Sequence, residues 1–221
     1  GGKLVPTPRS RSAENVFSST TSITLNEDGS GKATVSIDPK GEYRQLFMSL
    51  MQRVKDEQKN YFINSLGYVQ PDKFETSFDK DDHNSKARVD MEIEKIPDFS
   101  AGSKMFLNPR IYKIWKNALP KTEKRTQDFY FPFPMVKIDT TTYLLPEGFT
   151  VETLPKPRQL NFEFGSFTSG YRFDESHRTI VSTARLLLNE FRIPAAKYAA
   201  TEKFFNDVMA EFGEKIVIRH L

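Results

Sequence analysis

The sequence predicts a mainly β fold, α+β by content, in which antiparallel strands carry two amphipathic helices packed on the sheets. Three observations lead to this prediction. Many short segments alternate apolar and polar residues, the pattern of strands with one buried face. Asp, Gly and Pro turn residues separate these segments, and two segments repeat apolar residues every three or four positions instead. With 221 residues, of which 13% are aromatic, the chain is long enough to bury a core.

The first half begins with a predicted hairpin over residues 16–38, where "SITL" and "KATVSID" alternate in polarity around the turn "NEDGSG". An amphipathic helix is expected from Tyr43 to about Leu66, and Gly67 is its expected end. Further strands are predicted in "KFETSF" and "ARVDMEIEK". The pattern leaves the structure of residues 97–124 open, because "MFLNP" favours an extended chain, whereas a helical spacing follows at Ile111, Ile114, Trp115 and Leu119.

Strand patterns return from Thr126 onward, in "DFYFPFP", "MVKIDTTTYLL", "FTVETL", "LNFEF", "SFTSGYRF" and "RTIVSTARLLLNE". The stretch "LPEG" predicts a turn, since proline fixes φ and glycine tolerates a positive φ. Apolar residues move from even to odd positions near residue 165, which predicts a bulge or tight bend at Gly165-Ser166. A second helix is expected from Pro194 to about Gly213, with a last strand in "KIVIRH".

These elements divide the chain into three parts. Residues 1–15 are rich in Pro and Ser and are interpreted as a linker that leaves an upstream domain. Residues 16–124 form a β-rich half with one long helix, and residues 125–221 a β-sandwich-like half with a C-terminal helix and a last strand. The halves are expected to meet near residues 120–128, either as separate domains or packed as one unit.

Composition argues against several classes of function. The net charge of +3 is spread along the chain, which favours neither nucleic acid nor an anionic membrane as a partner. No apolar stretch approaches the roughly 20 residues of a membrane span. The chain contains no cysteine, so a disulfide, a thiolate metal site and a cysteine nucleophile are excluded within it.

Three histidines are the candidates for acid–base or metal chemistry: His83, His177 and His220. None has the spacing of a zinc motif, and turn histidines such as the first two are usually solvated. A Ser–His–Asp group assembled in space stays open, although no nucleophile-elbow motif is present. The turn "DKDDHN" offers oxygens to calcium but departs from the EF-hand pattern. No catalytic, cofactor-binding or metal-binding residue is therefore predicted.

Aromatic residues provide the candidate interaction surface. The cluster at 129–133 and Trp115, the single tryptophan, have the composition of a platform for a sugar or peptide, although aromatics at strand spacing are more often core. The residues proposed for this surface are Trp115, Phe129, Phe131 and Phe133.

Four stretches carry a resemblance to a known family: "RTQDFYFPFP", "LLPEGFTVETLPKP", "FEFGSFTSGYRFD" and "FRIPAAKYAATEKFFNDVMAEFGEKIVI". Their succession resembles the C-terminal β-rich region of unknown function in bacterial transglutaminase-like envelope proteins, the part that follows the transglutaminase core. The elements that match are Arg125, the turn at 145–149, the "LPKP" step at 154–157, the "FGSF" strand at 164–167, and Ile193-Pro194 with Tyr198. The resemblance is clear over 104–221 and looser over 1–103.

The resemblance implies an immunoglobulin-like sandwich character, a periplasmic or cell-surface location, and an upstream transglutaminase-like domain as partner. The family's catalytic Cys, His and Asp belong to that core, so no catalytic residue transfers to this chain. The first functional hypothesis is a non-catalytic accessory module that packs on or presents the core. The second is an independent carbohydrate- or peptide-binding module, and a hydrolase is the third.

Overall fold

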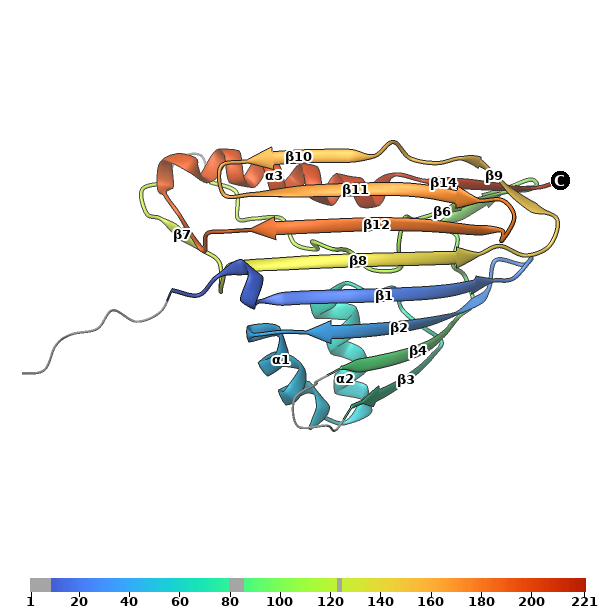
Figure 1. Ribbon diagram of the computed structural model, residues 1–221, viewed down its shortest axis with the longest axis horizontal. Coiled ribbons are helices and arrows are strands. Elements are labelled where there is room, and N and C mark those ends of the chain that lie inside the picture. Colours follow the sequence, from blue (N-terminus) through green and yellow to red (C-terminus); the bar gives the residue numbers. More distant parts are fainter. Residues whose placement is uncertain (1–8, 80–85, 123–124) are drawn as a thin grey trace, which may run out of the picture.

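An eight-stranded sheet runs through the molecule, and it takes four strands from each half of the chain (Figure 1). The computed structural model describes residues 9–79, 86–122 and 125–221. The strand order is β10-β11-β12-β8-β1-β2-β4-β3. The bounds of these strands are β1 (Val16–Leu25), β2 (Gly31–Pro39), β3 (Lys73–Phe78), β4 (Ala87–Ile93), β8 (Met135–Leu144), β10 (Arg158–Phe162), β11 (Gly165–Asp174) and β12 (Thr179–Leu188).

The two halves of the chain join at the centre of this sheet. All neighbouring strands pair antiparallel except β1 and β8, which pair in parallel from Val16 opposite Val136 to Thr24 opposite Leu144. A second sheet, of order β5-β6-β14-β9, also mixes the halves. Its strands are β5 (Phe99–Ala101), β6 (Lys104–Leu107), β9 (Phe149–Thr153) and β14 (Ile216–His220), while β7 (Phe129–Tyr130) pairs separately with β13 (Arg192–Ile193). The division into two domains stays a prediction.

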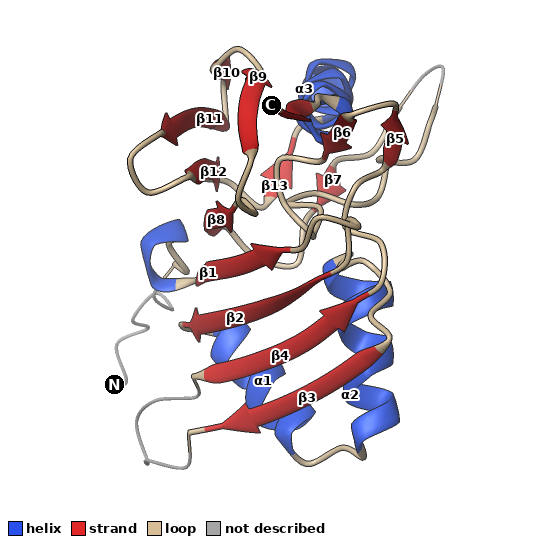
Figure 2. Ribbon diagram, turned by 90° about the vertical axis from the view of Figure 1, so that its right-hand side faces the viewer, coloured by secondary structure: helices blue, strands red, loops and turns tan. Residues whose placement is uncertain are grey.

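One face of the large sheet, the inner face, is covered along its whole width. Helices α1 (Glu42–Met51) and α2 (Lys55–Tyr61) lie on this face over β2, β4 and β3, and α3 (Tyr198–Ala210) lies with β6 and β14 over the other strands (Figures 1 and 2). Alternation of buried and exposed residues along β1 and β12 directs the apolar side chains inward. The fold is therefore a β-rich α+β fold with several antiparallel sheets, as the alternation predicts.

The first predicted helix is interrupted. Helix α1 ends at Met51, and Val54 is extended with ψ of 156° before α2 begins at Lys55. The side chain of Gln58 donates from Nε2 to the carbonyl of Arg53 at 2.8 Å and so binds the chain at the break. A short π-helical turn (Phe62–Leu66) follows, and Gly67 ends it with φ of 80°, as expected.

Residues 108–119 form no helix, so the helical alternative for this segment is wrong. The segment runs as an irregular layer under the large sheet. Side chains of β8 bind its carbonyls: Tyr143 donates to Asn108 at 2.9 Å, and Lys137 donates to Ile114 at 3.0 Å. These bonds satisfy carbonyls that a helix would otherwise pair internally.

Of the two alternatives predicted for the parity shift at Gly165-Ser166, the bulge is wrong, and the tight bend is present but lies two residues earlier. β10 and β11 form a hairpin with the turn at Glu163-Phe164, so Phe162 pairs with Gly165 and Leu160 with Phe167. Reversal of the chain places even positions of β10 opposite odd positions of β11. Gly165 still has a specific role, because a Cβ there would lie 2.0 Å from the carbonyl oxygen of Leu187.

Candidate functional site

A hollow of about 880 Å³ opens at the end of the sheet where the N-terminal segment runs. It is lined by residues 9–12, by the turn 132–134 between β7 and β8, by residues 189–192 from the end of β12 to the first residue of β13, and by Glu42 at the start of α1. The hollow thus brings together segments that are far apart in sequence. We call it the N-terminal hollow.

Asn15 connects the segments that line the N-terminal hollow. Its side-chain amide donates to the carbonyl of Pro134 at 2.9 Å and to the hydroxyl of Ser10 at 2.9 Å, and its amide oxygen accepts from the backbone N–H of Glu42 at 3.1 Å. One buried side chain therefore joins three of the lining segments. Gly41 allows this close approach, since a Cβ there would lie 2.4 Å from the amide oxygen of Asn15.

The apolar wall of the hollow continues into an exposed aromatic pair. Phe133 lines the hollow and packs edge-on against Tyr43, with ring centroids 5.2 Å apart. Phe191 lines it as well, and its ring lies 6.2 Å from that of Tyr130. Tyr130 is 57% exposed and Phe191 is 43% exposed. Two large aromatic rings that stay in solvent beside a hollow are typical of a surface that binds a partner.

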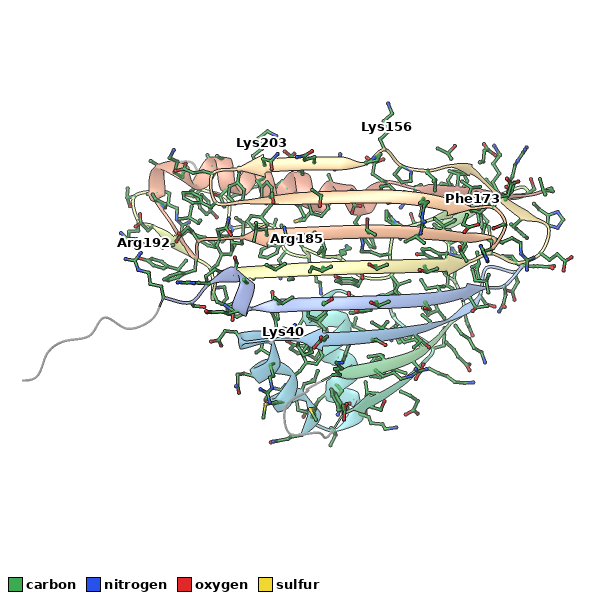
Figure 3. The ribbon with its side chains drawn as sticks, in the orientation of Figure 1. Lys40, Lys156, Phe173, Arg185, Arg192 and Lys203 are labelled. Atoms are coloured by element: carbon green, nitrogen blue, oxygen red, sulfur yellow. The ribbon has the colours of Figure 1, made fainter. Side chains whose placement is uncertain are left out.

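Charged side chains border the same wall. The Arg192 Nε lies 2.7 Å from a carboxylate oxygen of Asp128, and this carboxylate also accepts from the backbone N–H of Ala195 at 3.0 Å. The bonds from Arg192 and Ala195 lower the pKa of Asp128. Arg192 is thereby held at the rim, where Figure 3 labels it.

The four aromatics proposed from the sequence occupy different environments. Phe131 is buried, and Trp115 is half-buried between Phe131 and Phe205, with its indole N–H donating to the carbonyl of Asn117 at 2.7 Å. Phe129 packs against Tyr198. Among the four, only Phe133 lines the N-terminal hollow.

Sequence reasoning missed Phe191 and placed Tyr130 only within an aromatic cluster. A signal for Phe191 is present in "LLLNEFR", where two polar residues end the strand and leave the following aromatic outside the alternation. An aromatic residue just past the end of a strand has no assured place in the core. That signal gives a location but no partner.

His177 lies beside both Ser176 and Asp174, at the exposed hairpin tip between β11 and β12. Both contacts use the same ring nitrogen: Nδ1 is 2.9 Å from the Ser176 hydroxyl and 2.9 Å from the Asp174 carboxylate. A catalytic triad uses the two ring nitrogens for separate partners. The hydroxyl of Ser176, then the ring and backbone N–H of His177, lower the pKa of Asp174 to about 2, and the group stabilises the turn.

The other candidate groups are accounted for as far as the structure describes them. His220 packs edge-on against Phe149, with centroids 5.0 Å apart. His83, Asp81 and Asn84 lie outside the described residues. Within the described ranges, no three His, Asp or Glu side chains gather as metal ligands, and no helix there has the length and apolar character to cross a membrane.

The strongest concentration of charge is fully buried. Arg110 binds the carboxylate of Glu211 through two bonds of 2.6 and 3.1 Å, and its Nε lies 3.4 Å from Asp139. Asp139 in turn accepts from Ser19 at 2.7 Å and Thr141 at 2.9 Å. Burial raises the pKa of Asp139 even though the neighbouring guanidinium and hydroxyls act in the opposite direction. This network joins the sheet to the layer beneath it, and its charged side chains are removed from solvent.

Residues 103–218, more than half of the chain, match the family model described as a domain of unknown function with a solved structure, DUF3858. The chain belongs to the DUF3858 family. The DUF3858 match covers the strands from β6 to β13, α3 and most of β14, and it excludes β1 to β5. The resemblance to a β-rich domain of unknown function is confirmed at that level.

Two further comparisons add little. No curated protein matches the chain at a significant level. A crystal structure of a protein from Parabacteroides distasonis, described as a candidate protease, is similar over 45% of this chain and 19% of that one, at 18% sequence identity and a TM-score of 0.39. The chain therefore matches less than a fifth of that protein's length.

Proposed function

We propose that this chain is a non-catalytic accessory module of a transglutaminase- or protease-like envelope protein, where it packs on or presents the catalytic core of the same polypeptide. The observation that carries the proposal is the exposed pair Tyr130 and Phe191 beside a hollow lined by residues 9–12. A domain that precedes residues 9–12 in the polypeptide is joined to this chain at the end of the molecule where the hollow lies. Covering two exposed rings there stabilises its attachment by removing apolar surface from water.

The transglutaminase context, the immunoglobulin-like character and the periplasmic or cell-surface location belong to the same proposal. They are supported by the motif succession in residues 104–221 and by membership of the DUF3858 family. The absence of a cysteine in the chain fits a role outside the thiol chemistry of such a core.

An independent carbohydrate-binding module has less support. Sugar stacking requires an open aromatic face. Trp115 presents its ring to Phe205 at 4.3 Å, and Phe129 and Phe131 lie edge-on at 5.0 Å. The rings proposed for stacking thus pack on one another.

A double variant of the full native polypeptide tests the accessory role. Tyr130→Ser with Phe191→Ser removes both exposed rings, and we expect thermal unfolding of the polypeptide to split into separate transitions for core and module. In the 221-residue chain alone the same change lowers stability only slightly, since exposed positions contribute about 0.5 kcal/mol or less.

Phe99→Ser is the matched control. Phe99 is also an exposed aromatic residue, 44% exposed, and its ring stacks on that of Phe106. It lies in β5, at the edge of the second sheet, and neither ring lines the hollow. This variant should leave the transitions of the full polypeptide together. If the double variant and the control behave alike, the exposed pair does not hold the core.

A further inference from the structure

The outer face of the large sheet, opposite the helices, carries an array of hydroxyl groups. Figure 1 views this face directly. Pairing aligns Thr20 of β1, Thr140 of β8 and Thr183 of β12 in one row, and Ser22 with Thr142 in the next. We define the hydroxyl patch as the outward side chains Ser18, Thr20, Ser22, Thr140, Thr142, Thr168 and Thr183.

The other half of the same face differs sharply in composition. Across β2, β4 and β3 the outward residues form cross-strand ion pairs: Glu92 lies 3.7 Å from Lys32 and 2.7 Å from Lys73, and Arg88 lies 2.8 Å from Asp90. That is how a sheet face in contact with water is usually built. The outward residues of β1 and β8 include no charged side chain, and charged residues are depleted at the cores of protein interfaces.

Charged residues of both signs border the hydroxyl patch, and the carboxylates among them are Asp38 of β2, opposite Ser18, and Asp174 of β11. Arg172 and Arg185 lie on the outer face of β11 and β12, and Figure 3 labels Arg185 among the short side chains there. Both are exposed, and among the described residues neither has a carboxylate within ion-pair distance. Two guanidinium groups that have no carboxylate partner complement a partner surface that presents carboxylates.

The N-terminal segment already covers one corner of this face. The 3-10 turn η1 (Ser12–Glu14) packs on β8, and the outward residue Val136 is only 5% exposed. Ser12 also donates to the side chain of Asn189 at 3.1 Å, at the end of β12. The chain therefore enters the molecule across the outer face, next to the hydroxyl patch.

We infer that the hydroxyl patch is the surface on which the preceding core domain docks, through a flat face that bears carboxylates opposite Arg172 and Arg185. The inference rests on the proposed function, because it names the face that the same partner covers. At strand spacings of about 4.8 Å and a rise of about 3.4 Å per residue, β11, β12, β8 and β1 present roughly 600 Å². That area is the lower end of what one partner buries in a specific interface.

Cysteine labelling of the full native polypeptide tests the inference, because this chain contributes no cysteine of its own. Thr183→Cys places a thiol in the patch, and Glu75→Cys places one on the ion-paired half. Labelling with a maleimide, read peptide by peptide by mass spectrometry, is compared between the polypeptide and the 221-residue chain. We expect Thr183→Cys to react at least about tenfold more slowly in the polypeptide, and Glu75→Cys to react equally in both.

Further variants distinguish a failure of this inference from a failure of the proposed accessory role. Ser22→Cys repeats the test on another strand, in case Thr183→Cys disturbs the sheet. Arg172→Glu with Arg185→Glu should restore fast labelling at Thr183→Cys, since like charges then face each other. Unprotected Thr183→Cys and Ser22→Cys together with a protected Phe191→Cys would overturn the inference and leave the accessory role standing. Equal labelling of all three in polypeptide and chain would overturn both.

Discussion

Arg110 lies between two buried carboxylates, Glu211 at the end of α3 and Asp139 in β8, and all three side chains are removed from water. Tyr171 donates a further hydrogen bond to Glu211. The pKa of Arg110 rises although burial alone would lower it, because the carboxylate of Glu211 holds the guanidinium. At the scale of single residues, this network fixes how the sheet and the lower layer meet.

Glu211→Gln should destabilise the chain by about 3–5 kcal/mol, because it leaves Arg110 without its main counter-charge in a buried site. Urea unfolding measures the change. Lys203→Gln is the control: it removes an exposed pair with Asp207 within α3 and should cost under about 0.5 kcal/mol. A loss under about 1 kcal/mol for Glu211→Gln would show that the network contributes little.

Lys137 gives a prediction on pH. Burial lowers the pKa of its amine from the ordinary 10.5 to about 8. Between these values the unfolded chain binds more protons than the folded chain, so the stability of the wild type should rise from pH 8 to about 10.5 relative to Lys137→Met. The difference in unfolding free energy between the two proteins, followed over this range, checks the sign. A difference that does not change with pH would mean that the amine titrates normally.

At the scale of elements, the alternation of residues predicts the hairpin 16–38 and the strands of both halves, since burial of one face is a local property. The conformation of the irregular segment 108–119, in contrast, depends on residues far away in the sequence. Its carbonyls are bound by Lys137 and Tyr143, which lie more than twenty residues later in the sequence. The spacing within the segment therefore suggests a helix. In the folded chain, these distant donors bind the carbonyls instead, and no helix forms.

Gly165→Ala tests the close approach of β11 to β12 at the start of β11. The new methyl group would meet the carbonyl oxygen of Leu187 on the neighbouring strand, so we expect a loss of about 1–3 kcal/mol in thermal or urea unfolding. Gly213→Ala is the matched control, because nothing lies within 4 Å of its added Cβ. That change should be neutral or slightly stabilising. Equal effects of the two variants would contradict the close approach at Gly165.

At the scale of the whole molecule, the parallel pairing of β1 with β8 turns two predicted halves into one continuous sheet. Alternation in "VFSSTTSITL" and "MVKIDTTTYL" identifies both strands but not their adjacency, because pairing partners are chosen by tertiary packing. The N-terminal hollow was beyond prediction for the same reason, since Asn15, Pro134 and Glu42 meet only in the folded chain.

A continuous sheet should unfold in one step. Trp115 belongs to the first half of the chain but packs on Phe131 and Phe205 of the second, so its fluorescence reports on the packing of the second half. Reaction of a buried thiol in Ala33→Cys reports on β2 in the first half. We expect both probes to give the same urea midpoint. Separate midpoints would support the division near residues 120–128 into independent domains.

The most direct test of the accessory role is to purify the native polypeptide and sequence by mass spectrometry the peptides that precede Lys3. The account predicts a domain with a catalytic Cys, His and Asp joined to this chain through "GGKLVPTP". A native chain whose mature N-terminus lies at or near Lys3 would contradict it, because the hollow and the hydroxyl patch would then have no core domain to hold.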